Sequence, residues 1–348
     1  MILRAIDNFL GRGDAAVTVP ALDGALRPNR ALDDAAMRHP LADVDSLAVV
    51  DGALIAAAGD RLYRFDDGWQ AHGQAEGRIT AVTAVAGGLA VAVDGGDIVV
   101  MGGALDGRRY RVTTCITAMA AAGATLYVAS GSARQRAGEW QVDLLQRGAT
   151  GSLWRIDLES AKAERLAADL AWPAGLAVDD RGGLVFAEAW RHRLVRLDPA
   201  APARPQVQCD DLPGYPGRIG RGADGWWLAI FAPRSQLVEF VLREPAYVRR
   251  MIAEVPRDYW IAPKLRSGRS FYEPLQGGGV KHLGLLKPWA PSLSTGLCVR
   301  LDRAFQPVAS RHSRADGRTH GITGIVELDG TVFAAARGDD VVVAWQEG

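Results

Sequence analysis

LAWPAGLAVDDRGGLVFAEAWRHRLVRLD, residues 170–198, predicts three short strands joined by tight turns. Apolar residues from Pro173 to Val178 are followed by the turn sequence DDRGG and by a second apolar run, LVFA. From His192 to Leu197 basic and apolar residues alternate, which is typical of a strand with one face in solvent. The same pattern of strand, turn and strand recurs along the chain, which indicates a repeated β architecture.

Six copies of this pattern can be delimited, each with three or four expected strands. Blades of four strands that repeat at roughly 40 to 50 residues are typical of β-propellers. The sequence therefore predicts an all-β fold, a six-bladed β-propeller that forms one domain over residues 1–348. The units begin near Leu47, Ile79, Cys115, Leu170, Pro216 and Gly321.

The two ends of the chain are expected to meet in the last blade. The sixth unit, Gly321 to Trp345, contains only three expected strands. A β-like run from Ala16 to Val19 lies alone near the start of the chain. We expect this N-terminal strand to complete the last blade, because closing the ring leaves no sheet edge open.

The fifth unit is interrupted by an insertion at residues 233–294. Apolar residues from 237 to 255 fall at helical spacing, and Pro245 is expected to begin a second helix because a first turn does not need its missing N–H. The third strand of the unit is expected only at Gly296 to Asp302. Basic and aromatic residues mix within 235–290, so the segment is a lid over the channel, a homodimer contact or a peripheral membrane contact.

Composition sets limits on function. The 348 residues carry 40 basic and 40 acidic side chains, so the balance does not favour a nucleic-acid partner. No run of about eighteen apolar residues and no secretory signal pattern is found, and a cytoplasmic location is expected. Cys115, Cys209 and Cys298 are widely spaced without a CxxC pair, which favours buried thiols.

Four segments of the sequence follow one another in a characteristic order. They are DLLQRGATGSLWRID (143–157), WPAGLAVDDRGGLVFAEAWRHRLVRL (172–197), DLPGYPGRI (211–219) and THGITGIVELDG (319–330). In this order they resemble the strictosidine synthase-like family, six-bladed propellers related to gluconolactonases and paraoxonases, and the resemblance covers most of residues 44–345. It implies an enzyme that acts on a small organic molecule in the central channel.

The chain departs from this family where metal-dependent members bind their cation. Those members hold a divalent cation in the channel through oxygen ligands. Asp45 stands where they have a Glu, but Ala174 replaces one Asn ligand, and Gly217 and Arg218 replace an Asp-Asn pair. We therefore expect no metal and no other cofactor, with calcium disfavoured.

The catalytic position of the condensing enzymes has changed as well. Strictosidine synthases proper are metal-independent and move protons with a Glu in the last blade. Thr323 stands at that position here. A threonine hydroxyl is not an acid or base near neutral pH, so the condensing activity does not transfer directly.

Four residues are candidates for catalysis. We hypothesise that the guanidinium of Arg218 replaces the metal, pairs with Asp45 and offers donors to a carboxylate or an oxyanion; the alternative is a surface or bracing position. His320, just before the first strand of the last blade, is a candidate for proton transfer or a loop residue bonded to backbone. Glu188 matches a family Glu beside the channel, or anchors a neighbouring strand.

Six residues are candidates for substrate binding. Trp172 and Tyr215 precede prolines and are expected to form the wall of an apolar pocket. Ala174 and Thr323 occupy positions that face the channel in relatives. Ser130 and Arg134, in the loop of the third blade, are weaker candidates.

Three functions stay open on the sequence alone. The first is a metal-independent, strictosidine synthase-like enzyme acting on a small organic molecule, anionic ones included. The second is a lactone or ester hydrolase of the gluconolactonase and paraoxonase type. The third is a propeller that binds a ligand or a protein without catalysis.

Overall fold

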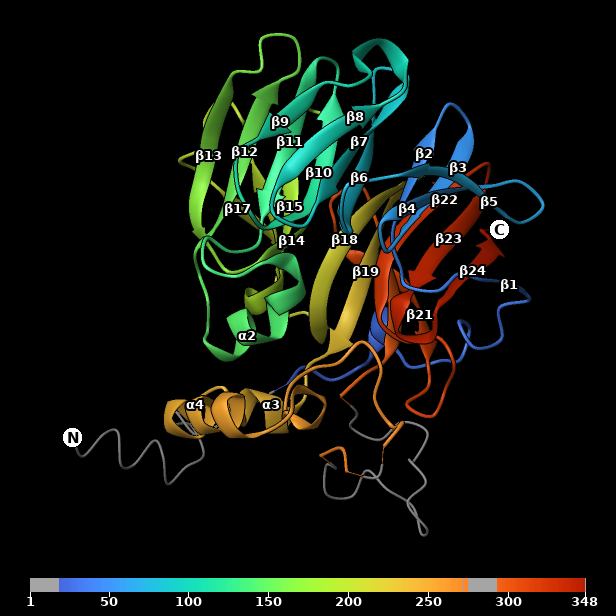
Figure 1. Cartoon of the computed structure of the whole chain (residues 1–348). Helices are drawn as coiled ribbons and strands as arrows, with labels where there is room; N and C mark the ends of the chain where they lie inside the picture. The colour runs from blue at the N-terminus through green and yellow to red at the C-terminus, as the bar shows by residue number, and fades with distance from the viewer. Residues whose placement is uncertain (1–18, 271, 275–292, 348) are drawn as a thin grey trace.

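The computed structural model describes residues 19–270, 272–274 and 293–347 of the chain. Six antiparallel sheets of four strands each form a closed ring, because the inner strand of each sheet contacts the inner strands of the two neighbouring sheets; Figure 1 shows the sheets from the side. This arrangement confirms the predicted six-bladed β-propeller. In each blade the strand order follows the sequence, except that a strand from the N-terminal part completes the last blade.

The strands of the first three blades run from residue 44 to residue 170. Blade one contains β2 (Val44–Val50), β3 (Ala53–Ala58), β4 (Arg61–Phe65) and β5 (Trp69–Gln74). Blade two contains β6 (Ile79–Val85), β7 (Gly88–Val93), β8 (Asp97–Met101) and β9 (Arg109–Arg111). Blade three contains β10 (Ile116–Ala122), β11 (Thr125–Ser130), β12 (Gly151–Asp157) and β13 (Ala163–Leu170).

The other three blades complete the ring. Blade four contains β14 (Pro173–Val178), β15 (Leu184–Glu188), β16 (Arg193–Leu197) and β17 (Gln206–Cys209). Blade five contains β18 (Gly214–Gly222), β19 (Gly225–Pro233), β20 (Gly296–Leu301) and β21 (Pro307–Ser313). Blade six contains β22 (Ile322–Leu328), β23 (Thr331–Ala336), β24 (Val341–Gln346) and β1 (Met37–Pro40).

The turn within residues 170–198 shows how the sequence builds a blade. The Asp179 carboxylate accepts hydrogen bonds from the backbone N–H groups of Arg181 and Gly183, each at 2.8 Å. Gly182 has a φ of 75°, a left-handed conformation that glycine adopts without steric strain. The turn reverses the chain between β14 and β15, and the Arg196 side chain of β16 pairs with Asp179.

Our prediction of the closing strand named the wrong residues. The strand that pairs with β24 is β1, with Met37 opposite Ala344 and Pro40 opposite Val341. Val19 lies outside every strand, and residues 16–18 lie outside the described residues. The β1 sequence, MRHP, has no apolar alternation because it is a short, half-buried edge strand, where a terminal proline is tolerated.

The core lies between neighbouring blades rather than within the channel. One apolar cluster joins Trp227 of blade five to Ile322 and Val343 of blade six, and similar clusters join the other neighbours. The three cysteines are buried and unpaired, as expected. Burial raises the pKa of Cys115 to about 12 and that of Cys209 to about 11, so these thiols stay protonated and inert.

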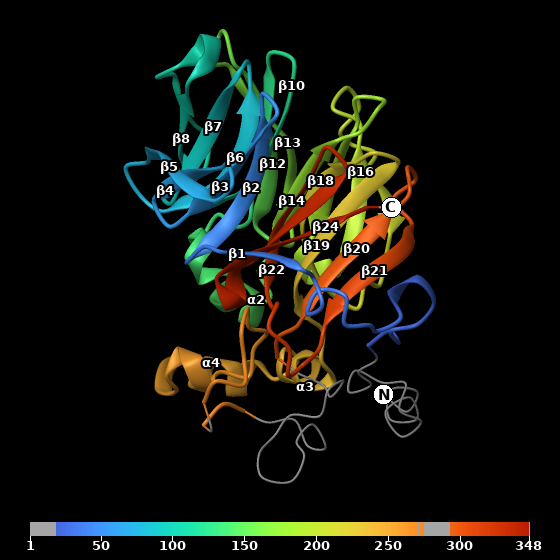
Figure 2. The same ribbon diagram turned by 90° about the vertical axis from the view of Figure 1, so that its right-hand side faces the viewer.

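The insertion after β19 contains the two expected helices, α3 (Gln236–Val241) and α4 (Pro245–Glu254). Pro245 occupies the first turn of α4, as predicted. Both helices lie at the same end of the ring as α2 (Trp140–Leu145) (Figures 1 and 2). Among the described residues no helix is long and apolar enough to cross a membrane.

Candidate functional site

The inner strand of every blade has a register shift near its start. In blade one the pairing with β3 jumps from Val44 to Ser46, and Asp45 lies between them without a partner. A β-bulge of this kind inserts one residue and redirects its side chain. The residues at the six shifts are Asp45, Thr80, Thr117, Ala174, the pair Gly217 and Arg218, and Thr323.

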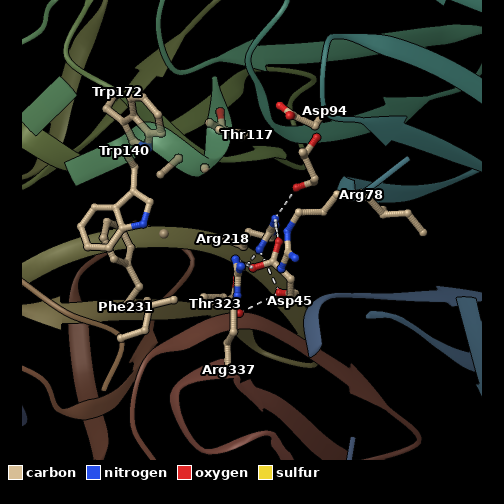
Figure 3. A pocket seen from close by; sticks show the side chains of 17 residues that line it. Asp45, Arg78, Asp94, Thr117, Trp140, Trp172, Arg218, Phe231, Thr323 and Arg337 are labelled. Atoms are coloured by element: carbon tan, nitrogen blue, oxygen red, sulfur yellow. Dashed lines mark hydrogen bonds and ion pairs between the residues drawn. The ribbon is translucent and has the colours of Figure 1, made fainter. Parts of the chain in front are cut away.

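These six positions meet at a cavity of about 170 Å³ at the helical end of the channel (Figure 3). A second chamber of about 500 Å³ is lined by all six inner strands on the other side of Arg218. Because Arg218 lines both spaces, its side chain separates them. The remaining lining residues of the smaller cavity are Arg78, Ile79, Asp94, Ala137, Gly138, Trp140, Trp172, Phe231, Leu265 and Arg337.

The structure places the Arg218 guanidinium inside the channel, where our hypothesis put it, and pairs it with Asp45. Nη2 lies 3.0 Å from Asp45 Oδ2 and donates to the Thr80 carbonyl at 2.6 Å. Nη1 donates to the carbonyls of Asp45 and Thr323 at 3.0 and 2.6 Å. Nε is buried and has no partner in the described part of the chain. The terminal nitrogens therefore hold blades one, two and six, which leaves them engaged rather than open to a ligand.

Asp45 is an ionised, fully engaged carboxylate. Its Oδ1 accepts a hydrogen bond from Arg337 Nη1 at 3.1 Å, and its Oδ2 faces Arg218. Burial alone would raise the pKa of Asp45, but Arg218 and then Arg337 outweigh it and bring the pKa to about 2. A carboxylate with this pKa is a weak proton acceptor near neutral pH. The geometry favours a structural and electrostatic role for Asp45.

The divalent cation implied by the resemblance does not fit these residues. Ala174 and Gly217 offer no side-chain oxygen, and Asp45 is the only carboxylate among the residues at the six register shifts. The carbonyl oxygens of Asp45, Thr80 and Thr323 that point to the centre already accept hydrogen bonds from Arg218. A hard cation needs six or more such oxygens, and here a guanidinium occupies them.

Two further arginines flank Asp45, and neither was among the candidates predicted from the sequence. Arg78 forms a bidentate pair with Asp43, at 2.6 and 2.5 Å, and the Asp43 hydrogen bond contributes most to raising its pKa. Arg337 bridges the two aspartates, with Nε 3.6 Å from Asp43 and Nη1 bonded to Asp45. Each arginine lies directly beside the end of a strand, Arg78 before β6 and Arg337 after β23. A basic residue at such a strand end is the sequence signal that could have identified both arginines as site residues.

The opposite wall of the cavity is aromatic. Trp172 stacks on Trp190 with ring centroids 5.3 Å apart, and Trp140 meets Phe231 edge to face at 5.5 Å. The backbone of Trp172 has a φ of 55°, a strained value for a bulky residue. Gly131 lies against its ring, since a Cβ there would come within 2.9 Å of Trp172 Cδ2. Trp172 and Ala174 thus line the cavity, where the sequence pattern placed them.

Asp94, after β7, is a carboxylate of the cavity that the sequence pattern indicated only as part of a turn. Its Oδ2 lies 3.4 Å from Arg136, and its Oδ1 is buried without a hydrogen-bond partner in the described residues. A buried carboxylate oxygen without a partner is uncommon and points to a ligand or a water molecule. Asp94 is therefore the acid–base candidate that the geometry adds.

His320 does not lie at the cavity. It is completely buried, its Nε2 donates to the Arg314 carbonyl at 2.7 Å, and its Nδ1 lies 2.8 Å from the Ser294 hydroxyl. A carbonyl only accepts, so the ring is neutral with its proton on Nε2. Burial and then the charge of Arg266 lower its pKa. Both ring nitrogens are engaged, which agrees with the alternative that His320 is a loop residue bonded to backbone and not with a role in proton transfer.

Glu188 is also away from the cavity. Its carboxylate accepts hydrogen bonds from the Ala171 N–H and the Arg193 Nε, both at 2.8 Å, and pairs with Arg191. The side chain is completely buried and anchors the segment before β14 to β15 and β16. The arrangement corresponds to the alternative in which Glu188 anchors a neighbouring strand.

The remaining predicted binding residues divide into two groups. Thr323 lines the cavity and donates its hydroxyl to the Asp45 carbonyl at 2.8 Å. Tyr215 is buried behind the aromatic wall, with its hydroxyl 3.4 Å from Glu239. The Ser130 hydroxyl bonds to that of Thr113 at 2.6 Å. Arg134 is exposed. None of these last three candidates lines the cavity: Tyr215 lies in the aromatic cluster behind the wall, Ser130 ends β11, which is not an inner strand, and Arg134 belongs to the exposed loop after it.

One solved structure is similar to this chain over most of its length. A crystal structure of a proposed gluconolactonase superposes with a TM-score of 0.51 at 10% identity, covering 89% of this chain and 91% of that one. The likeness is one of fold. A chain of a nidogen–laminin complex gives a TM-score of 0.43 at 17% identity, covering 54% of this chain and 72% of that one. No family model and no curated protein matches the sequence.

Proposed function

We propose that this protein binds a small organic molecule in the cavity above Arg218 and acts on it without a divalent cation. In this proposal it is a metal-independent enzyme of the strictosidine synthase-like group in the broad sense. The observation that carries the proposal is a cavity with charged groups on one side and aromatic rings on the other, at the centre of the ring of blades. Concave sites with apolar walls and a few convergent polar groups are typical of small-molecule binding.

The chemistry open to this cavity is proton transfer combined with stabilisation of negative charge. Asp94 lines the cavity and its Oδ1 has no hydrogen-bond partner among the described residues, so we assign this carboxylate to take a proton from an attacking water or amine. Arg337 Nη2 donates no hydrogen bond to the residues that the structure describes, so it is available to an anionic group of the substrate or to a developing oxyanion. Asp45 and Arg218 keep this donor in place and do not exchange protons themselves.

A lactone or ester hydrolase is the second candidate, and the free oxygen of Asp94 also favours it. In such a reaction Asp94 would take a proton from water while the water oxygen attacks the carbonyl carbon and the carbonyl π electrons move to the carbonyl oxygen. The tetrahedral intermediate would then expel the alkoxide, which takes the proton from Asp94 as the C–O bond breaks. The fold likeness to a proposed gluconolactonase is compatible with this candidate. The third candidate is a propeller that binds its ligand without turnover.

Turnover assays on Asp94→Asn separate the three candidates. The substrates are aryl esters, lactones, and an amine paired with an aldehyde. We expect the variant to lose at least about 100-fold in kcat for the class that is turned over, a usual contribution of general acid–base catalysis, with ligand affinity little changed. Asp97→Asn is the matched control, because Asp97 belongs to the same blade and pairs with Arg111 on an exposed surface.

The outcomes point to different functions. Turnover of esters or lactones that depends on Asp94 would establish the hydrolase, and turnover of the amine with the aldehyde would establish a condensing enzyme. Binding without turnover of any class would leave the non-catalytic propeller. Turnover that survives in Asp94→Asn would remove Asp94 from the mechanism.

The insertion contributes to this site through Leu265, which lines the cavity. Its backbone is packed closely on blade six, since a Cβ on Gly338 would lie 2.2 Å from the Leu265 carbonyl oxygen. Gln141 of α2 also donates to the Pro263 carbonyl at 2.8 Å. We propose that this part of the insertion covers the cavity, which favours the lid over a homodimer or membrane contact.

A further inference from the structure

We infer that the ligand is a planar molecule of about one aromatic ring that carries a carboxylate, with its ring on the Trp140 and Phe231 side and its carboxylate on Arg337. The inference rests on the proposed function, because it names the chemical class that the same cavity selects. Size, wall shape and charge each support one part of it.

The volume limits the ligand to about one ring. The cavity measures about 170 Å³, and an apolar protein cavity of about 150 Å³ is sufficient for benzene. Arg218 closes the path to the larger chamber beyond it, so the ligand cannot extend along the channel. A bicyclic or longer molecule would have to project outward past Leu265.

The aromatic wall favours a flat ligand. Trp172 is held by its stack on Trp190 and by the space that Gly131 leaves, so the wall cannot easily adapt to another shape. Phe231 and Trp140 are fixed edge to face. Rings of this kind bind other rings through offset stacking or edge-to-face contacts, which raise affinity about two- to tenfold beyond the effect of area burial.

The charges favour an anion. The ion-paired network around the cavity contains four guanidinium groups and three carboxylates among the described residues, so one positive charge is unbalanced. Half-buried Arg337 has an unused donor, Nη2, and this nitrogen belongs to a group already fixed by Asp45. A ligand carboxylate would balance the charge and gain a charge-assisted hydrogen bond. The network consists of Arg78, Arg136, Arg218 and Arg337 with Asp43, Asp45 and Asp94.

Calorimetric titration with four probes tests the three parts separately. Benzoate has the ring and the charge, benzamide has the ring alone, cyclohexanecarboxylate has the charge without the flat ring, and acetate has only the charge. We expect benzoate to bind at least about tenfold more tightly than benzamide, which lacks the charge-assisted hydrogen bond, and about two- to tenfold more tightly than cyclohexanecarboxylate, which lacks the flat ring. Acetate, which has no ring, should also bind more weakly than benzoate.

Variants assign the effect to the cavity. Arg337→Gln should abolish the preference for benzoate over benzamide, whereas Arg155→Gln, which removes an ion-paired arginine on the outside of blade three, should retain it. If Arg337→Gln does not fold, the salt dependence of the wild-type protein replaces it. High salt should then weaken the binding of benzoate and leave the affinity for benzamide unchanged.

The results that would overturn the inference differ from those that would overturn the proposed function. Benzamide binding as tightly as benzoate would refute the anionic part, and cyclohexanecarboxylate binding as tightly as benzoate would refute the planar part; in both cases the cavity still binds a small molecule. The proposed function itself is tested with a broad set of neutral, cationic and anionic fragments. It fails if none of them binds, or if the binding that is found is unchanged in Gly131→Ala, whose added methyl group lies against Trp172 of the cavity wall.

Discussion

Arg218 and Asp45 meet at the centre of the propeller, with Nη2 3.0 Å from Oδ2, although 173 positions separate them in the sequence. The guanidinium also donates to carbonyls of blades one, two and six, so one side chain from blade five joins four blades. This cross-link forms the floor of the candidate site. Removing either partner of the cross-link should therefore lower the stability of the fold.

Asp45→Asn should lower the free energy of unfolding by about 3 to 5 kcal/mol, because it leaves the buried Arg218 with no opposing carboxylate and leaves Arg337 with Asp43 alone. Denaturant unfolding measures the loss. Asp43→Asn is the matched control: Asp43 pairs with Arg78, but its side chain is 43% exposed, and a loss of about 1 kcal/mol or less is expected. Equal losses in the two variants would contradict the central role of Asp45.

The contribution of Asp45 should disappear in acid. Its pKa is about 2 in the fold against 3.8 ordinarily, so the unfolded chain takes up the proton first as the pH falls. The stabilisation, about 2 kcal/mol, is present above pH 4 and is lost as the pH falls from about 4 to about 2. The stability difference between wild type and Asp45→Asn should shrink over this range, and a constant difference would refute the prediction.

A chelator should leave the Tm unchanged, whereas Arg218→Ala should lower it strongly. The positive charge at the centre of the ring is supplied by the guanidinium, and its removal leaves the Asp45 carboxylate and the Thr80 and Thr323 carbonyls without their donor. Scanning calorimetry with and without EDTA tests this. A Tm that falls on chelation and recovers with calcium would show that a cation contributes after all.

His320→Gln should weaken the fold and leave the site intact. The buried imidazole loses two hydrogen bonds, so about 1 to 3 kcal/mol of stability is expected to be lost at neutral pH. Burial lowers the pKa of His320, so protonation opposes the native state, and the wild-type stability contributed by this residue falls as the pH drops through 6.5. Ligand affinity and any turnover should be unchanged, and their loss would restore His320 as a site residue.

Gly131→Ala should impair ligand binding more than folding. A Cβ at this position would lie 2.8 Å from Thr117 Cγ2 and 2.9 Å from Trp172 Cδ2, so the indole or the threonine has to shift. An affinity loss of about two- to tenfold is expected, comparable with the loss of one ring contact. Gly68→Ala is the control, since a Cβ there meets nothing within 4 Å. Unchanged affinity in Gly131→Ala would show that the ligand does not use the Trp172 wall.

Most of the ring could be predicted from local sequence. Turn residues such as Asp179 and Gly182, with apolar runs between them, act through neighbours a few positions away, and the six blades follow from their repetition. The closing strand was misplaced because β1, a short edge strand, carries no periodic signal. Its position depends on β24, which lies at the other end of the chain.

The contacts of the site, unlike the blades, depend on residues that are far apart in the sequence. The sequence by itself determined the repetition of the blades, and its resemblance to the propeller family placed Asp45, Ala174 and Thr323 at positions that face the channel. For Arg218 the sequence left open whether the side chain enters the channel or lies at the surface. Only the tertiary structure decided that the terminal nitrogens of Arg218 donate to protein carbonyls and to Asp45. It also decided that Arg337 lies 3.1 Å from Asp45, 292 positions away in the sequence, and that His320 is buried outside the cavity. The physical reason is ring closure, since register shifts orient each side chain locally but the distances between blades arise only when all six pack together.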